Sequence, residues 1–119
     1  MKKLLIASTI TVLTLTSVVS TPKAHASDIA QNICEYVAAD DKKRMRSFLK
    51  TNKLKIRRIF DGIQCNGKNI LEFASTSGSV ETGSLIISKL PKKVVSENLA
   101  ALQTGSKPLI DAANERVSS

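Results

Sequence analysis

The stretch that decides the fold begins at residue 65 and reads CNGKNILEFASTSGSVETGSLIISKL, ending at residue 90. Asn69 is expected to cap a helix, because its side-chain oxygen can accept a hydrogen bond from a free amide of the first turn. Gly78 is expected to end that helix, since glycine adopts the left-handed C′ conformation without a steric clash. Ser79 can cap a second helix, and Pro91 follows at a natural stop. The stretch therefore predicts a glycine turn and two short helices.

A resemblance to the ankyrin repeat accompanies this pattern. Residues 67–81 read GKNILEFASTSGSVE, which is similar to the ankyrin pattern GxTPLHxAxxxGHxE. Asn69, Ile70 and Glu72 stand where that pattern has Thr, Pro and His. The resemblance implies an ankyrin-like helix pair and, by analogy alone, protein binding.

A step of 38 residues indicates internal repetition. It carries Ile33 to Leu71 and on to Leu109. The sequence KPLIDAA at residues 107–113 looks like a second, shortened copy of the ankyrin-like corner. Two interpretations stay open, namely true repeats and the coincidences that any helical chain produces.

A second resemblance covers about residues 28–90. CEYV at residues 34–37 and CNG at residues 65–67 are similar to a family of short, secreted, uncharacterised bacterial proteins that carry a domain of unknown function. This resemblance implies export and paired cysteines. It implies no activity, cofactor or catalytic residue.

The first 26 residues have the features of a secretory signal peptide. MKK is positively charged, residues 4–19 are apolar and rich in Ser and Thr, and AHA at residues 24–26 is a small-x-small cleavage site. The apolar run is shorter than the ~20 residues that a membrane-spanning helix needs. We expect cleavage before Ser27 and export to the periplasm, with full secretion as the alternative. Cleavage removes three lysines and His25, the only histidine, and lowers the net charge from +8 to +5.

Two cysteines remain in the exported chain, Cys34 and Cys65. An even number of cysteines in an exported protein favours a disulfide. The alternatives are two free thiols or a redox pair, although their spacing is not that of a Cys-x-x-Cys site. A metal site is disfavoured, because two ligands without a histidine are too few.

These observations predict an all-α fold, a small ankyrin-like helical array of about five short helices tied by one disulfide. Residues 27–103 form the helical domain, and residues 104–119 form a short C-terminal helix with a frayed tail. Within the domain we expect helices at about 27–39 and 42–51, and an extended connector or irregular turn over residues 54–63.

The segment from Lys42 to Arg58 carries nine basic residues and no acidic one, whereas acids outnumber bases ten to six in the rest of the exported chain. On a helix, Met45, Phe48 and Leu49 form one apolar stripe, and the basic residues lie opposite. Either this is a solvated helix face or it binds an anionic partner. The predicted anionic-partner surface comprises Lys42, Lys43, Arg46, Lys50, Lys53, Arg57 and Arg58.

No residue set predicts catalysis. Without a histidine, the exported chain cannot form a Ser-His-Asp or Cys-His centre. Ser47 and Lys50 match the Ser-x-x-Lys motif, but its companion elements are absent. Asp40 and Asp41 are expected to cap a helix rather than to act as an acid–base pair. We therefore expect no enzyme activity, no cofactor and no metal.

The sequence predicts a non-catalytic interaction module of the cell envelope with an unknown partner. The alternative function is an anionic-surface binder that meets acidic lipid or lipopolysaccharide through residues 42–58. Nucleic acid is not expected, because the aromatic residues occupy apolar positions and leave no stacking platform.

Overall fold

The computed structural model describes residues 26–119, and seven α-helices account for most of this part of the chain. The predicted signal peptide lies outside the described residues except for its last residue. The helices are α1 (Ala26–Ala38), α2 (Lys42–Thr51), α3 (Ile56–Ile59), α4 (Ile70–Thr76), α5 (Val80–Lys89), α6 (Lys92–Leu102) and α7 (Lys107–Ser118). A 3-10 turn (Phe60–Gly62) and two short strands, β1 (Gln64–Cys65) and β2 (Lys68–Asn69), connect α3 to α4. The all-helical prediction is confirmed, whereas the expected number of about five helices is too low.

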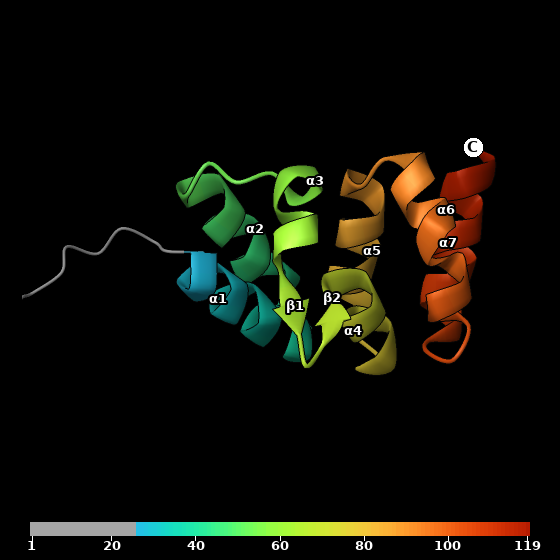
Figure 1. The fold of residues 1–119 in the computed structure, drawn as a ribbon, viewed down its shortest axis with the longest axis horizontal. Coiled ribbons are helices and arrows are strands. Elements are labelled where there is room, and N and C mark those ends of the chain that lie inside the picture. Colours follow the sequence, from blue (N-terminus) through green and yellow to red (C-terminus); the bar gives the residue numbers. More distant parts are fainter. Residues whose placement is uncertain (1–25) are drawn as a thin grey trace, which may run out of the picture.

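Three helix pairs follow one another along the molecule, namely α1 with α2, α4 with α5, and α6 with α7 (Figure 1). Helices α1, α4 and α6 contact one another in sequence and form one row. Helices α2, α5 and α7 form the second row in the same way. The short helix α3 lies against α5. Each pair thus buries its apolar side against the next pair.

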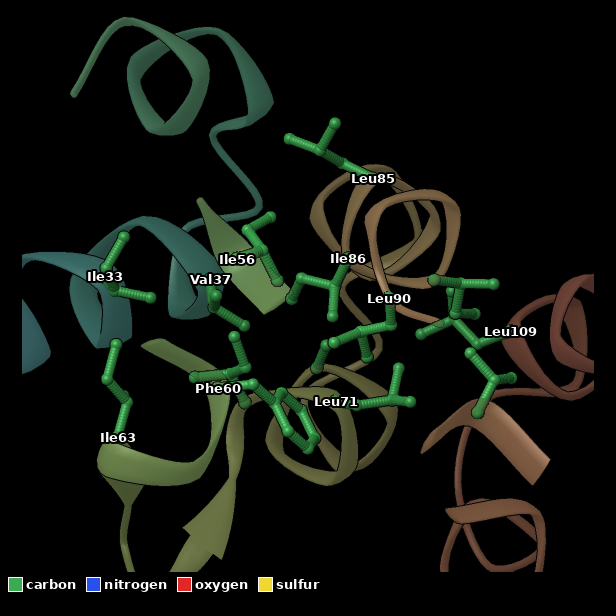
Figure 2. Packing of buried hydrophobic residues seen from close by; sticks show 14 of the residues in the cluster. Ile33, Val37, Ile56, Phe60, Ile63, Leu71, Leu85, Ile86, Leu90 and Leu109 are labelled. Carbon is green, nitrogen blue, oxygen red and sulfur yellow. The ribbon is translucent and has the colours of Figure 1, made fainter. Parts of the chain in front are cut away.

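A continuous apolar core runs between the two rows (Figure 2). The three positions related by the 38-residue step, Ile33, Leu71 and Leu109, are all fully buried. They do not occupy equivalent helices, because Ile33 and Leu71 lie in the first row and Leu109 lies in the second.

Helix α4 begins and ends as its sequence predicts. The Asn69 side chain accepts a hydrogen bond from the Glu72 amide at 2.8 Å. At the other end Gly78 has a φ of 68°. Its amide donates to the Ser75 carbonyl, and the next amide donates to the Ala74 carbonyl at 2.8 Å. This pair of bonds is a Schellman ending, which requires the left-handed conformation that glycine adopts readily.

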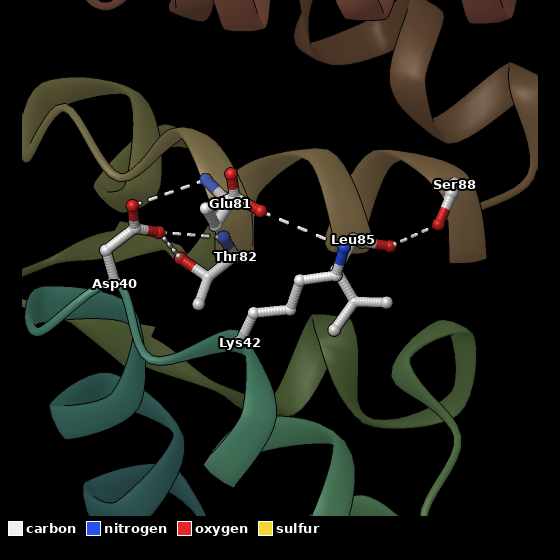
Figure 3. A network of polar contacts seen from close by, with 6 residues as sticks. All are labelled: Asp40, Lys42, Glu81, Thr82, Leu85 and Ser88. Carbon is white, nitrogen blue, oxygen red and sulfur yellow. Dashed lines mark hydrogen bonds and ion pairs between the residues drawn. The ribbon is translucent and has the colours of Figure 1, made fainter.

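Helix α5 is capped by Asp40, which lies 42 positions before Thr82 in the chain. Ser79 occupies the cap position, but its hydroxyl donates to the Val37 carbonyl instead. The Asp40 carboxylate accepts hydrogen bonds from the Thr82 amide at 2.8 Å and the Glu81 amide at 3.3 Å (Figure 3). The prediction that the Ser79 side chain caps this helix is therefore wrong. The carboxylate of Asp40 accepts the hydrogen bonds from the free amides instead.

The expected connector at residues 54–63 contains helix α3 and the 3-10 turn, so the prediction of extended or irregular structure is wrong here. A β-hairpin with a two-residue turn follows, in which Gln64 pairs with Asn69. Its turn residues Asn66 and Gly67 have φ values of 54° and 76°. Such a turn needs two positive φ angles, and Asn-Gly is the pair that tolerates them best.

The predicted disulfide between Cys34 and Cys65 is confirmed, with the two Cα atoms 5.7 Å apart. It joins α1 to β1 and closes a loop that contains α2 and α3. The last helix, α7, corresponds to the predicted C-terminal helix. It packs against α5 and α6. Leu109 and Ala113 of this helix are fully buried.

Candidate functional site

Helix α2 has the bounds and the apolar side that its sequence predicts. Asp41 caps it, because the carboxylate accepts a hydrogen bond from the Arg44 amide at 3.1 Å. Met45 is fully buried, and Phe48 and Leu49 are half-buried against the core. The helix therefore has one side fixed in the core, and its basic residues face outward.

The predicted anionic-partner surface is largely exposed. Lys42 is half-buried, and its ammonium lies 3.8 Å from the Glu81 carboxylate. Arg44, which also belongs to the basic segment, lies 3.6 Å from Asp41. Within residues 26–119, the seven other basic residues of the segment take part in no ion pair. Six members of the predicted surface are exposed, namely Lys43, Arg46, Lys50, Lys53, Arg57 and Arg58.

A cavity of about 650 Å³ opens on this side of the molecule, between α2, the start of α3 and α5. Two members of the predicted surface, Arg46 and Arg57, line it. The structure adds Lys55 and Lys89, which bring the number of basic side chains around this cavity to four. The remaining lining residues are Leu49, Leu54, Ile56, Leu85 and Ser88.

The cavity combines an apolar base with a cationic rim. Ile56 and Leu85 are 2% and 4% exposed, so they form a fixed base. Leu49 and Leu54 are half-buried, and the four basic residues are exposed. No aspartate or glutamate belongs to the lining residues. Such a hollow attracts anions, because its cations have no neighbouring carboxylate to neutralise them.

The sequence pattern for the DUF3718 family, described as proteins of unknown function, matches residues 33–97, which are more than half of the chain. The chain belongs to the DUF3718 family. The match confirms the expected domain of unknown function and extends from the middle of α1 to the middle of α6. No curated protein and no solved structure gives a significant match to this DUF3718 protein.

The Ser-x-x-Lys pair does not form an organised site. Ser47 and Lys50 are both exposed on α2, and no hydrogen bond joins their side chains among the described residues. Ser47 lines a second, shallower cavity of about 340 Å³, whose lining does not include Lys50. Tyr36 and Phe48 meet edge to face there, with ring centroids 5.6 Å apart.

The two neighbouring acids, Asp40 and Asp41, have structural roles as the caps of α5 and α2. In the part of the chain that the structure describes, no three His, Cys, Asp or Glu side chains lie close enough to hold a metal ion. No helix between residues 26 and 119 combines the length and the apolar character needed to cross a membrane.

The basic cavity was only partly visible in the sequence. Arg46, Lys55 and Arg57 belong to the charged run, and all three side chains are exposed. Lys89 lies in a different part of the sequence and becomes a neighbour only because α5 packs beside α2 and α3. No local pattern marks a single lysine at the end of a helix as part of a binding site.

Proposed function

We propose that this DUF3718 protein is a non-catalytic interaction module of the cell envelope and that its partner is anionic. The observation that carries the proposal is the cavity beside α5, where four basic side chains from three segments surround one opening without an acidic neighbour. Four further exposed members of the predicted surface, Lys43, Lys50, Lys53 and Arg58, extend the same charge over the surface around α2 and α3.

The chemistry of these residues suits phosphate and carboxylate groups. The guanidinium groups of Arg46 and Arg57 can each donate two parallel hydrogen bonds to such an anion. Lysines such as Lys55 and Lys89 add mobile charges that need no fixed geometry. Clustered exposed charge also speeds the encounter with an oppositely charged partner.

Two further properties belong to this proposal. Export follows from the signal-peptide features of residues 1–26, with the periplasm preferred to full secretion. An ankyrin-like stacking of the helix pairs is supported by the ankyrin-like pattern of residues 67–81 and by the two helix rows. A stack of three pairs also meets the minimum length at which such arrays become stable.

The test is binding of the purified, exported protein to vesicles of anionic phospholipid and to lipopolysaccharide over a range of salt concentrations. A triple variant, Lys43→Glu, Lys50→Glu and Arg58→Glu, removes surface charge outside the cavity. The matched control changes three exposed lysines on α6 and α7 to glutamate, namely Lys92, Lys93 and Lys107.

We expect binding that falls steeply with salt, because exposed charges are screened beyond about 10 Å at 0.1 M ionic strength. The triple variant should lose most of this binding, and the matched control should keep it. If neither anionic phospholipid nor lipopolysaccharide is bound at low salt, an anionic envelope surface is ruled out as the partner. Equal loss in both triple variants would show that net charge matters and that the position of the charges does not.

A further inference from the structure

The cavity beside α5 differs from a simple charged surface, because its base is built from leucine and isoleucine side chains. We propose that it binds a single-chain anionic amphiphile, such as a free fatty acid. The acid group would lie among Arg46, Arg57, Lys55 and Lys89, and the hydrocarbon chain would lie against the leucines. This inference rests on the proposed function, since it names the ligand class of the same site.

The apolar part of the cavity comes from three separate segments. Leu85 is a buried member of the core cluster and lies on the side of α5 that faces α2 (Figure 2). Leu49 comes from α2, and Leu54 comes from the segment that follows it. A ligand that covers these side chains removes apolar surface from water, which is favourable by about 0.8 kcal/mol for each buried methylene group.

The polar groups of α5 do not compete for the apolar part of a ligand. The Ser88 hydroxyl donates to the Leu85 carbonyl of the preceding turn at 2.7 Å (Figure 3). Its hydrogen is therefore directed at its own helix. The strongest polar groups of the lining are then the four exposed cations, whereas its leucines and its isoleucine are buried or half-buried.

The size and chemistry of the cavity distinguish this ligand class from larger partners. Its volume of about 650 Å³ lies within the range of sites for one small molecule. A flat membrane or protein surface needs the outer charges but gains nothing from a hollow with an apolar base. A single-stranded nucleic acid needs aromatic platforms, and none of the lining residues is aromatic.

The experiment is calorimetric titration of the purified, exported protein with dodecanoate below its micelle concentration. Dodecanol supplies the same chain without the charge, and acetate supplies the charge without the chain. We expect one dodecanoate per protein molecule and at least about tenfold weaker binding of each control ligand, which corresponds to about 1.4 kcal/mol. Equal binding of dodecanol, or of several dodecanoate ions per molecule, would overturn the inference.

Two variants localise the site. Leu54→Gln introduces a polar group into the apolar part, and Leu99→Gln is its matched control at a half-buried position of α6 outside the cavity. We expect Leu54→Gln to weaken dodecanoate binding at least fivefold and Leu99→Gln to leave it unchanged. Thermal unfolding of both variants verifies that they are folded. If the two variants bind equally well, the ligand lies elsewhere and the inference fails.

A third experiment distinguishes a fatty acid bound by the protein alone from a fatty acid that stays in a membrane. Zwitterionic vesicles containing some oleate are mixed with the protein and sedimented. We expect oleate to move from the pellet to the supernatant with the wild-type protein and much less with Leu54→Gln. Protein that pellets with the vesicles without extracting oleate would overturn the inference. Salt-sensitive binding to anionic phospholipid would then still support the broader proposed function.

Discussion

The two sides of helix α5 are packed in different ways. On the side of α7, a methyl group added at Gly83 would lie only 2.5 Å from a terminal carbon of Leu109, which is fully buried. On the side of α2 and α3, the same helix borders a cavity of about 650 Å³. One helix thus has a side without spare room and a side that leaves space for another molecule.

Different interactions hold these two sides. Close apolar contact joins α5 to α7. On the other side, the carboxylate of Asp40 caps α5, Lys42 pairs with Glu81, and the disulfide restrains the segment that contains α2 and α3 (Figure 3). Directional bonds and a covalent link fix the position of a helix without filling the space beside it. The comparison shows how a domain this small can keep a cavity and remain folded.

The largest effect is expected when the covalent link is removed. Replacing Cys34 and Cys65 by alanine should lower the free energy of unfolding by about 3–4 kcal/mol, because the loop between them regains its freedom in the unfolded chain. Urea unfolding measures the change. Hydrogen exchange should show greater loss of protection in α1 and α2 than in α6 and α7. A uniform loss along the chain would contradict the idea that the two sides are held separately.

A smaller effect is expected on the closely packed side. Gly83→Ala forces Leu109 to move, which costs about 1–3 kcal/mol, and the better helix propensity of alanine offsets up to about 1 kcal/mol of this cost. Ser88→Thr adds a methyl group to the same helix on the cavity side, and we expect a change within about 0.5 kcal/mol. Thermal unfolding of the two variants measures the difference directly. Similar destabilisation by both would remove the contrast between the two sides.

The smallest effect is expected at the polar cap. Asp40→Ala removes the acceptor for the first amides of α5 and should destabilise the protein by about 1 kcal/mol. Asp40 also has a φ of 52°, a conformation that asparagine adopts more readily than alanine, so part of the loss in Asp40→Ala comes from the backbone. Asp40→Asn keeps a side-chain acceptor and should therefore retain most of the stability. Equal losses in the two variants would assign the effect to the charge of the carboxylate.

Local signals in the sequence predicted the elements whose stabilising contacts are also local. Asn69 caps the helix that follows it, and Gly78 ends the same helix, because both residues act on amides and carbonyls within one turn. The bounds of α2 followed from its own apolar stripe and from Asp41 just before it. The Asn66-Gly67 pair, for which we predict only a turn, is also the signal of a β-hairpin.

The features that the sequence did not predict depend on contacts between distant segments. Asp40 caps α5 only because the end of α1 packs beside it, and the local pattern favoured Ser79 for this role. Helix α3 is only four residues long and begins without a side-chain cap, so it has no recognisable start. Lys89 joins the cavity through packing alone. Three of the four cations around the cavity could be taken from the charged run, whereas its apolar base required the folded chain.

The position of the disulfide has a consequence for proteolysis. All nine lysines and arginines of the basic segment lie between Cys34 and Cys65, inside the covalent ring. A trypsin-like protease that cuts once in this segment therefore opens the ring but releases no fragment. The two pieces stay joined by sulfur and separate only after reduction. A cut protein would consequently migrate as an intact chain on a non-reducing gel, although its basic segment had been severed.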